Sequence, residues 1–158
     1  MAIGALPSGV RDWLRDSDWF PGQDIGSEAD ELVDIVVAHF RRQGTPLEPV
    51  QPAVDVLRSF GDLRLVHPQA PRDVMVMEPT VGYEGDAAAI AELAGTLGAR
   101  LFPVGYDPIE CGLNLVDEAG RFFHLHWSSG YFLGRDQNDM FERFLMRVTP
   151  PDAEDFFS

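Results

Sequence analysis

The sequence predicts a single α+β domain, in which an antiparallel or mixed sheet of about five to six strands has its helices packed mainly on one side. Residues 1–60 carry apolar side chains at helical spacing, whereas residues 63–133 are mostly short apolar runs separated by turn residues. The length of 158 residues suits one domain with its own hydrophobic core. We expect the domain to occupy residues 1–150 and residues 151–158 to form a short acidic tail that frays.

Three helices are predicted in the N-terminal third. The first covers Ser8–Asp16. The second begins with Ser27 as its N-cap and ends before Gly44, because small polar residues cap helices and glycine ends them. The third covers Pro52–Phe60, with Gly61 as its C-cap. Each helix presents one apolar face, formed in turn by Val10, Trp13 and Leu14, by Leu32, Val33, Val36, Val37 and Phe40, and by Val54, Leu57 and Phe60.

The rest of the chain is predicted to form a series of short strands. One helix interrupts this series, and another helix follows the last strand. The first two apolar runs are residues 63–66 and 74–77. Asp86 can cap a helix that ends at Gly98. Strands are then expected at 101–106, 113–116, 121–127 and 131–133, before a closing helix that begins at Asp136. Residues 117–120 join two of these strands as a β-hairpin, since Gly120 can supply a positive φ.

The composition excludes several classes of partner. The chain carries 12 basic and 26 acidic residues, a formal net charge of −14, and every basic residue other than histidine is arginine. This charge argues against nucleic acid and anionic membrane surfaces, because both attract basic patches. The sequence has no apolar run of about 20 residues for a membrane span, and residues 1–10 lack the pattern of a signal peptide. We therefore expect a cytoplasmic protein whose charge is compatible with a basic partner.

His124, His126 and Cys111 are the candidates for catalysis or metal binding. The two histidines point to the same face of a predicted strand, and with Cys111 or Asp117 they could form a metal site. However, the chain lacks the close ligand spacing of zinc sites, and the residues around Cys111 match no thiol-enzyme signature. Structural roles are therefore favoured for all three side chains, and we expect no catalytic residue, metal or cofactor.

Neighbouring carboxylates are a second candidate for catalysis. Two such pairs lie in turn-like stretches, Asp107 with Glu110 and Asp117 with Glu118. Solvated acids are common in turns, and the two distinct environments that acid–base catalysis requires are not evident there.

Tryptophan is the other informative residue type, because so large an apolar ring packs in a core or against a partner. At least one of three tryptophans is expected to do so: Trp13, Trp19 or Trp127.

Several segments together suggest a family. Trp19-Phe20-Pro21-Gly22 is similar to an aromatic-Pro-Gly segment before a long helix, and Phe60-Gly61-Asp62-Leu63 is similar to a Phe-Gly-Gly-Leu step into a first strand. With later matches in the same order, these segments resemble the SUKH superfamily of bacterial immunity proteins, and most closely its third subgroup, over about Trp19 to Met146. Gln23, where the family usually has a basic residue, and Asp62 depart from its pattern. The later matches are Leu97-Gly98, Leu101, Pro103-Val104-Gly105, Leu115, Asp117, Gly120, Arg121 and Leu133-Gly134.

The resemblance implies a SUKH-like fold and a protein that binds and neutralises a toxin of the same or a kindred bacterium, without catalytic residues. Toxin domains bound by the family include nucleases and deaminases, and a nuclease surface is commonly basic because its substrate is a polyanion. Two alternatives remain open: a regulatory or scaffolding protein on the same fold, and a small enzyme that uses His124, His126 or Cys111. The candidate contacts with a toxin are acidic turns and nearby aromatics, namely Tyr106, Asp107, Glu110, Asp117, Glu118 and Trp127.

Overall fold

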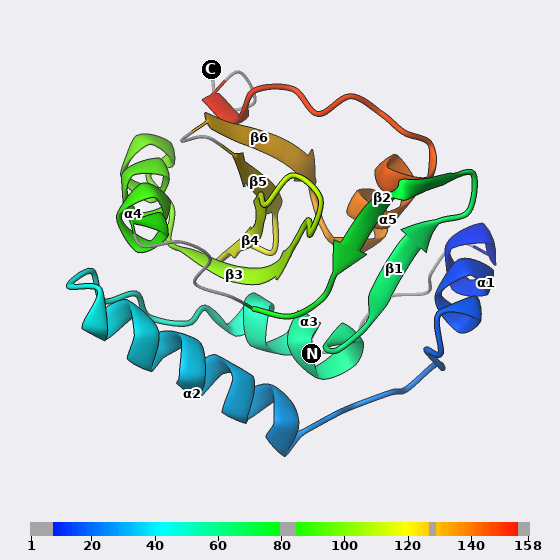
Figure 1. Ribbon diagram of the computed structural model, residues 1–158, viewed down its shortest axis with the longest axis horizontal. Coiled ribbons are helices and arrows are strands. Elements are labelled where there is room, and N and C mark those ends of the chain that lie inside the picture. The colour runs from blue at the N-terminus through cyan, green and yellow to red at the C-terminus, as the bar shows by residue number, and fades with distance from the viewer. Residues whose placement is uncertain (1–7, 80–84, 127–128, 155–158) are drawn as a thin grey trace.

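A computed structural model describes residues 8–79, 85–126 and 129–154 (Figure 1). The helices are α1 (Ser8–Asp16), α2 (Ser27–Arg42), α3 (Gln51–Phe60), α4 (Asp86–Leu97) and α5 (Gln137–Leu145). The strands are β1 (Arg64–His67), β2 (Ala70–Val76), β3 (Leu101–Tyr106), β4 (Leu113–Asp117), β5 (Phe122–His126) and β6 (Ser129–Gly134). They form one sheet in the order β1-β2-β3-β4-β5-β6, and every neighbouring pair is antiparallel. The predicted α+β class and the antiparallel sheet are confirmed.

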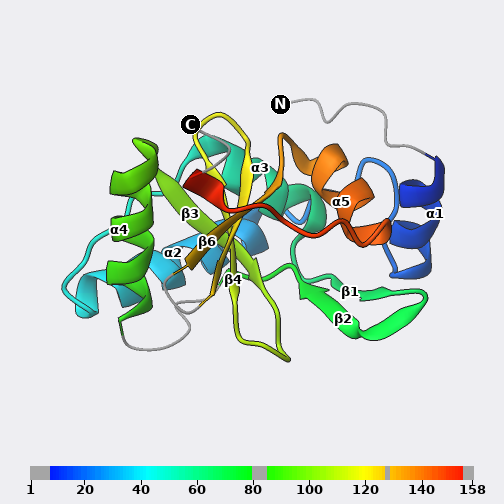
Figure 2. The ribbon, with the colours of Figure 1, turned by 90° about the horizontal axis from the view of Figure 1, so that it is seen from above.

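The sheet divides into a β1–β2 hairpin and a β3–β6 meander. Strands β2 and β3 are paired only at Val76 and Tyr106, so the hairpin swings away from the meander (Figures 1 and 2). At this point Gly105 lets the two strands approach, since a Cβ atom there would lie 2.5 Å from the carbonyl oxygen of Val76. Two hollows lined by residues of β2, β6 and α5 lie at this divergence.

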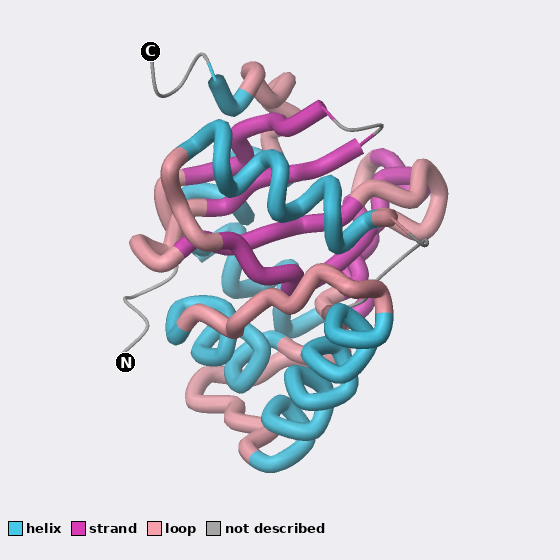
Figure 3. The backbone as a smooth tube through the Cα atoms, turned by 90° about the vertical axis from the view of Figure 1, so that its left-hand side faces the viewer, coloured by secondary structure: helices cyan, strands magenta, loops and turns pink. Residues whose placement is uncertain are grey.

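A β-bulge in β6 lets two helices pack on opposite faces of the meander. Phe122 is paired with Gly134 and Phe123 with Phe132, so β6 has one extra residue at this point. Side chains on the two sides of this bulge therefore alternate between the faces of the sheet in opposite order. Gly130 faces α4, where a Cβ atom would lie 2.6 Å from a methyl group of Leu93, and Gly134 faces the backbone of α5. Figure 3 shows α4 lying across the strands, and Figure 2 shows α5 on the other side of the sheet.

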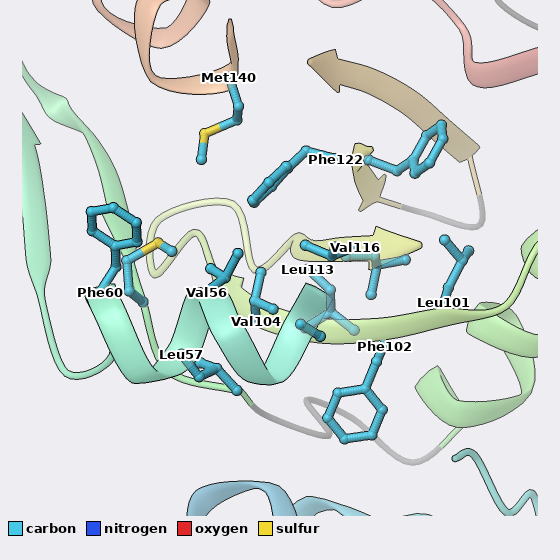
Figure 4. Packing of buried hydrophobic residues seen from close by; sticks show 14 of the residues in the cluster. Val56, Leu57, Phe60, Leu101, Phe102, Val104, Leu113, Val116, Phe122 and Met140 are labelled. Carbon is cyan, nitrogen blue, oxygen red and sulfur yellow. The ribbon is translucent and has the colours of Figure 1, made fainter. Parts of the chain in front are cut away.

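The core continues through the sheet because both faces are covered. All residues of β4 are buried, and Val56 of α3 lies beside Val104 of β3 (Figure 4). A chain of aromatic rings joins α1, α3 and α5: Phe141 of α5 contacts Phe60 of α3 at 5.1 Å and Trp13 of α1 at 5.9 Å between ring centroids, and Phe60 also contacts Trp19 at 5.6 Å. Such pairs contribute roughly 0.5–1.5 kcal/mol each beyond the burial of their area.

Trp13 and Trp19 are both core residues, as expected for at least one tryptophan. Each is 7% exposed and uses its indole N–H to donate to a backbone oxygen, Trp13 to Val66 at 2.9 Å and Trp19 to Ser59 at 3.0 Å. Trp13 also stacks on Phe144 of α5 at 5.5 Å. Both rings thus connect the N-terminal segment to distant parts of the chain.

The ends of three helices differ in detail from the prediction. The N-cap of α2 is Gly26 rather than Ser27, and that of α4 is Gly85 rather than Asp86, with no side-chain cap bond in either case. Gly61 is the C-cap of α3 as predicted, but its φ is −57°, so the left-handed conformation is not the reason for glycine. A Cβ atom at Gly61 would instead overlap the carbonyl oxygen of Leu57.

The segment after residue 150 packs on the domain as far as residue 154. Ala153 is fully buried, Asp152 forms a β-bridge with Tyr131, and the backbone N–H of Phe132 donates to Pro151 at 2.9 Å. The expectation of a frayed tail is therefore wrong for residues 151–154, because this segment covers the outer edge of β6. Residues 155–158 lie outside the described residues.

Candidate functional site

The turn between β3 and β4 is held in a fixed shape by its own backbone and by Asp107. One carboxylate oxygen of Asp107, Oδ1, accepts from the backbone N–H of Ile109 at 2.8 Å and of Glu110 at 3.2 Å. The backbone N–H of Cys111 donates to the Asp107 carbonyl at 2.8 Å, and Cys111 has a φ of 64°. This geometry places two side chains outward at the tip: Glu110 is exposed and Ile109 is 51% exposed.

A hollow of about 360 Å³ lies between this turn, β2 and β5. Its polar side is formed by Asp107 and Glu110 of the turn together with His124, His126 and other residues of the meander. Its apolar lining comes from β2, β6, α5 and the segment after α5. The full lining consists of Val74, Met75, Asp107, Glu110, Asn114, His124, His126, Tyr131, Leu133, Phe144, Thr149 and Pro150.

His124 is fixed by its neighbours on both sides of the ring. Its Nδ1 lies 2.7 Å from Oδ1 of Asn114, the residue directly across the β4–β5 ladder, so Nδ1 carries the proton and donates it. On the other side, Nε2 lies against Gly112, where a Cβ atom would overlap the ring. Burial is the main cause that lowers the pKa of His124, and His126 lowers it further, while the charge of Asp107 opposes the shift. His124 is therefore a neutral hydrogen-bond donor at neutral pH.

The structure does not assemble the metal site considered from the sequence. His124 and His126 share a face, and their ring centroids are 6.3 Å apart. Within residues 8–79, 85–126 and 129–154, no group of three or more His, Cys, Asp or Glu side chains is arranged to hold a metal ion. Cys111 is exposed at the turn and makes no disulfide.

Comparison with known families gives a match over most of the chain. The sequence profile of the SUKH-3 immunity protein family matches residues 6–147. The chain belongs to the SUKH-3 immunity protein family. Comparison with curated proteins and with solved structures found no match to either. The resemblance to the third SUKH subgroup is thus confirmed.

The predicted contacts of this SUKH-3 protein lie at two separate ends of the sheet. Tyr106, Asp107 and Glu110 lie at the β3–β4 turn, whereas Asp117 and Glu118 lie at the β4–β5 turn. Successive turns of an antiparallel meander lie at opposite ends of the shared strand, which places the two groups roughly 15 Å apart along β4. The acids therefore do not form one continuous patch. Trp127 lies outside the described residues.

Asp117 does not belong to the exposed surface of this SUKH-3 domain. Its side chain is fully buried, and its Oδ1 accepts from the backbone N–H groups of Ala119 and Arg121, each at 2.9 Å. Its other oxygen receives a 2.6 Å bond from the Arg121 guanidinium. The expectation that Asp117 is a solvated acid is wrong, because the carboxylate is used to close the β4–β5 turn.

Glu118 is exposed and is paired with Arg100 at 2.7 Å. The side-chain hydrogen bond from Arg100 lowers the pKa of Glu118, with a smaller contribution from the backbone N–H of the same residue. Much of its charge is thus offset within the SUKH-3 domain.

Two features of the site were not predicted from the sequence: the apolar lining of the hollow and the exposed Ile109. The apolar side of the hollow comes from β2, α5 and the segment after α5, which are far in sequence from the turn. Ile109, by contrast, had a visible signal, since a large apolar residue lies two positions from Asp107 and next to Glu110 in a turn.

No helix within the described ranges combines the length and apolar character that a bilayer span needs.

Proposed function

We propose that this chain binds a toxin made by its own or a kindred bacterium and neutralises it in the cytoplasm through a stoichiometric protein–protein contact. Membership of the SUKH-3 immunity protein family supports the general role. The observation that supports the mode of action is the net charge of −14 on one domain. A strongly acidic protein is attracted to a basic surface, and such complementarity accelerates association and favours the correct partner.

Five of the arginines are paired with acids inside the domain. Arg58, Arg100, Arg121, Arg143 and Arg147 are each engaged by an acid of the same chain. Each pair joins one acid to one arginine, so the net charge of −14 is carried by residues outside these five pairs. A nuclease domain with a basic substrate-binding surface is the kind of toxin that this charge suits best.

The β3–β4 turn is the contact that we propose for the toxin. Protein interfaces combine an apolar centre with a polar rim, and here the exposed Ile109 lies between Asp107 and Glu110. The hydrogen bonds within the turn hold this arrangement before a partner arrives. A preformed contact loses less conformational entropy on binding than a flexible one.

The experiment is a binding measurement by isothermal titration calorimetry with the toxin domain encoded beside this chain, together with growth of cells that express both proteins. We expect a 1:1 complex whose affinity falls with added salt, and growth that is restored by co-expression. The Ile109→Asp, Glu110→Lys double variant should weaken both effects. A Glu31→Gln variant of an exposed side chain of α2 is the comparison, since it changes the net charge by the same single unit at another surface. Absence of complex with every neighbouring toxin would count against the proposal.

A further inference from the structure

The hollow beside the β3–β4 turn has an acidic rim and no arginine among its described lining residues. Two of those residues, Asp107 and Glu110, are acids, and both belong to the turn. The adjoining hollow contains Arg143 and Arg147, but these are already paired with Asp139 at 3.0 Å and with Asp73 at 3.3 Å. Within the described part of the chain, neither Asp107 nor Glu110 forms an ion pair with an arginine.

Both carboxylates have oxygens available to a ligand. Asp107 uses Oδ1 to hold the turn, whereas its Oδ2 makes no hydrogen bond to another described residue. Glu110 donates its backbone N–H to that turn, and its side chain has no partner in the described ranges. Two nearby carboxylates with free acceptors match the several N–H groups of a guanidinium ion.

The remaining walls suit the rest of an arginine side chain. Val74, Met75, Leu133 and Phe144 provide apolar surface for the methylene groups, which pack well on such surface while the charged end stays near polar groups. His126 and Tyr131 add planar rings of the kind on which guanidinium ions stack. His124 is held neutral inside the site and so adds no positive charge at neutral pH.

We propose that this hollow receives one arginine side chain of the toxin, with the guanidinium bound by Asp107 and Glu110. This inference rests on the proposed function and specifies the group that the toxin contributes. The volume of about 360 Å³ is near the lower end of the roughly 300–1,000 Å³ range of small-ligand pockets, which suits a single side chain. The absence of a three-ligand cluster in the described residues disfavours a metal ion as the occupant.

The first test needs no toxin. N-acetyl-arginine methylamide is titrated into the ¹⁵N-labelled full chain and followed by NMR, with the uncharged citrulline analogue and the lysine analogue as comparisons. We expect saturable shifts at Asn114, Glu110 and the two histidines with the arginine probe alone. Binding should weaken about tenfold in the Asp107→Asn, Glu110→Gln double variant, equivalent to about 1.4 kcal/mol. Equal binding of the citrulline or lysine analogue, or shifts that saturate elsewhere, would overturn the proposal.

The double variant is designed to preserve the fold. Asparagine at position 107 keeps an Oδ1 acceptor for the N–H groups of Ile109 and Glu110, and position 110 is exposed. Its matched control is Glu31→Gln, Asp34→Asn, which removes the same number of charges from exposed positions of α2. Unchanged NMR dispersion in both variants confirms that the comparison concerns the hollow.

The second test uses the toxin and separates the two proposals. If the chain binds the toxin and the pocket variant binds at least tenfold more weakly than the α2 control, both proposals are supported. If the pocket variant binds as well as the control, the arginine proposal is overturned while the function stands. If the wild-type chain binds no toxin, the function fails, and the probe titration still decides whether the hollow binds a guanidinium ion.

Discussion

Gly112 lies directly against the ring of His124, so that a Cβ atom at position 112 would overlap the imidazole. Gly112→Ala must therefore displace the histidine from Asn114 or shift the β3–β4 turn. We expect a loss of about 1–3 kcal/mol in the free energy of unfolding, the usual range for overpacking. Denaturant titration measures this loss. Gly95→Ala is the control, because open space surrounds that position in α4 and the change should be neutral or stabilising by up to about 1 kcal/mol.

Asp117 is expected to contribute to stability rather than to toxin binding. Asp117→Ala leaves the N–H groups of Ala119 and Arg121 without their acceptor and Arg121 without its partner. The expected loss is about 3 kcal/mol in the free energy of unfolding. Glu118→Gln, which weakens only an exposed ion pair, should leave the free energy of unfolding close to that of the wild type. If Asp117→Ala were as stable as the wild type but bound the toxin poorly, our assignment of this residue would be wrong.

His124 should make stability depend on pH. Its pKa is lowered in the folded state, so between its ordinary value near 6.5 and its folded value the unfolded chain binds more protons than the native chain. The free energy of unfolding therefore falls as the pH drops below about 6.5. A His124→Asn variant should lose part of this dependence. Chemical denaturation of both proteins between pH 5 and 8 gives the two slopes, and equal slopes would contradict the prediction.

Ala153 tests whether the C-terminal segment belongs to the domain. It is fully buried, so Ala153→Glu places a charge in the core, and we expect a loss of about 3 kcal/mol in the free energy of unfolding. Ala119→Glu makes the same substitution at an exposed turn position and should change stability by less than about 0.5 kcal/mol. Thermal unfolding of the two variants provides the comparison, and similar melting temperatures would show that residue 153 is not packed in solution.

Local patterns predicted much of this fold because local interactions determine it. Leu101–Tyr106 is a strand with the predicted bounds, Gly98 ends α4 with a φ of 65°, and Gly120 supplies a φ of 86° in the β4–β5 turn. Asp136 caps α5 by accepting from the N–H of Asp139 at 2.8 Å. Each of these features depends on residues that are close together in sequence.

The site was harder to predict from the sequence because it depends on contacts between residues that are far apart in the chain. The sequence places Asp107, Glu110, Asp117 and Glu118 in turns, but strand direction alone separates them into two groups, and the burial of Asp117 follows from its bonds to Arg121. The apolar walls of the hollow are brought to the histidines by the divergence of β2 from β3. The hydrophobic periodicity of a single segment does not predict that divergence.

The most direct test of the central claim is a titration of toxin activity with the purified protein. A fixed concentration of the toxin domain encoded beside this chain, well above the dissociation constant, is mixed with increasing amounts of the immunity protein. Stoichiometric binding predicts a linear fall in activity that reaches its end at equimolar protein, with a weaker effect in high salt. Complete inactivation by a small fraction of an equivalent would indicate catalysis instead, and full activity in the presence of excess protein would contradict neutralisation of that toxin.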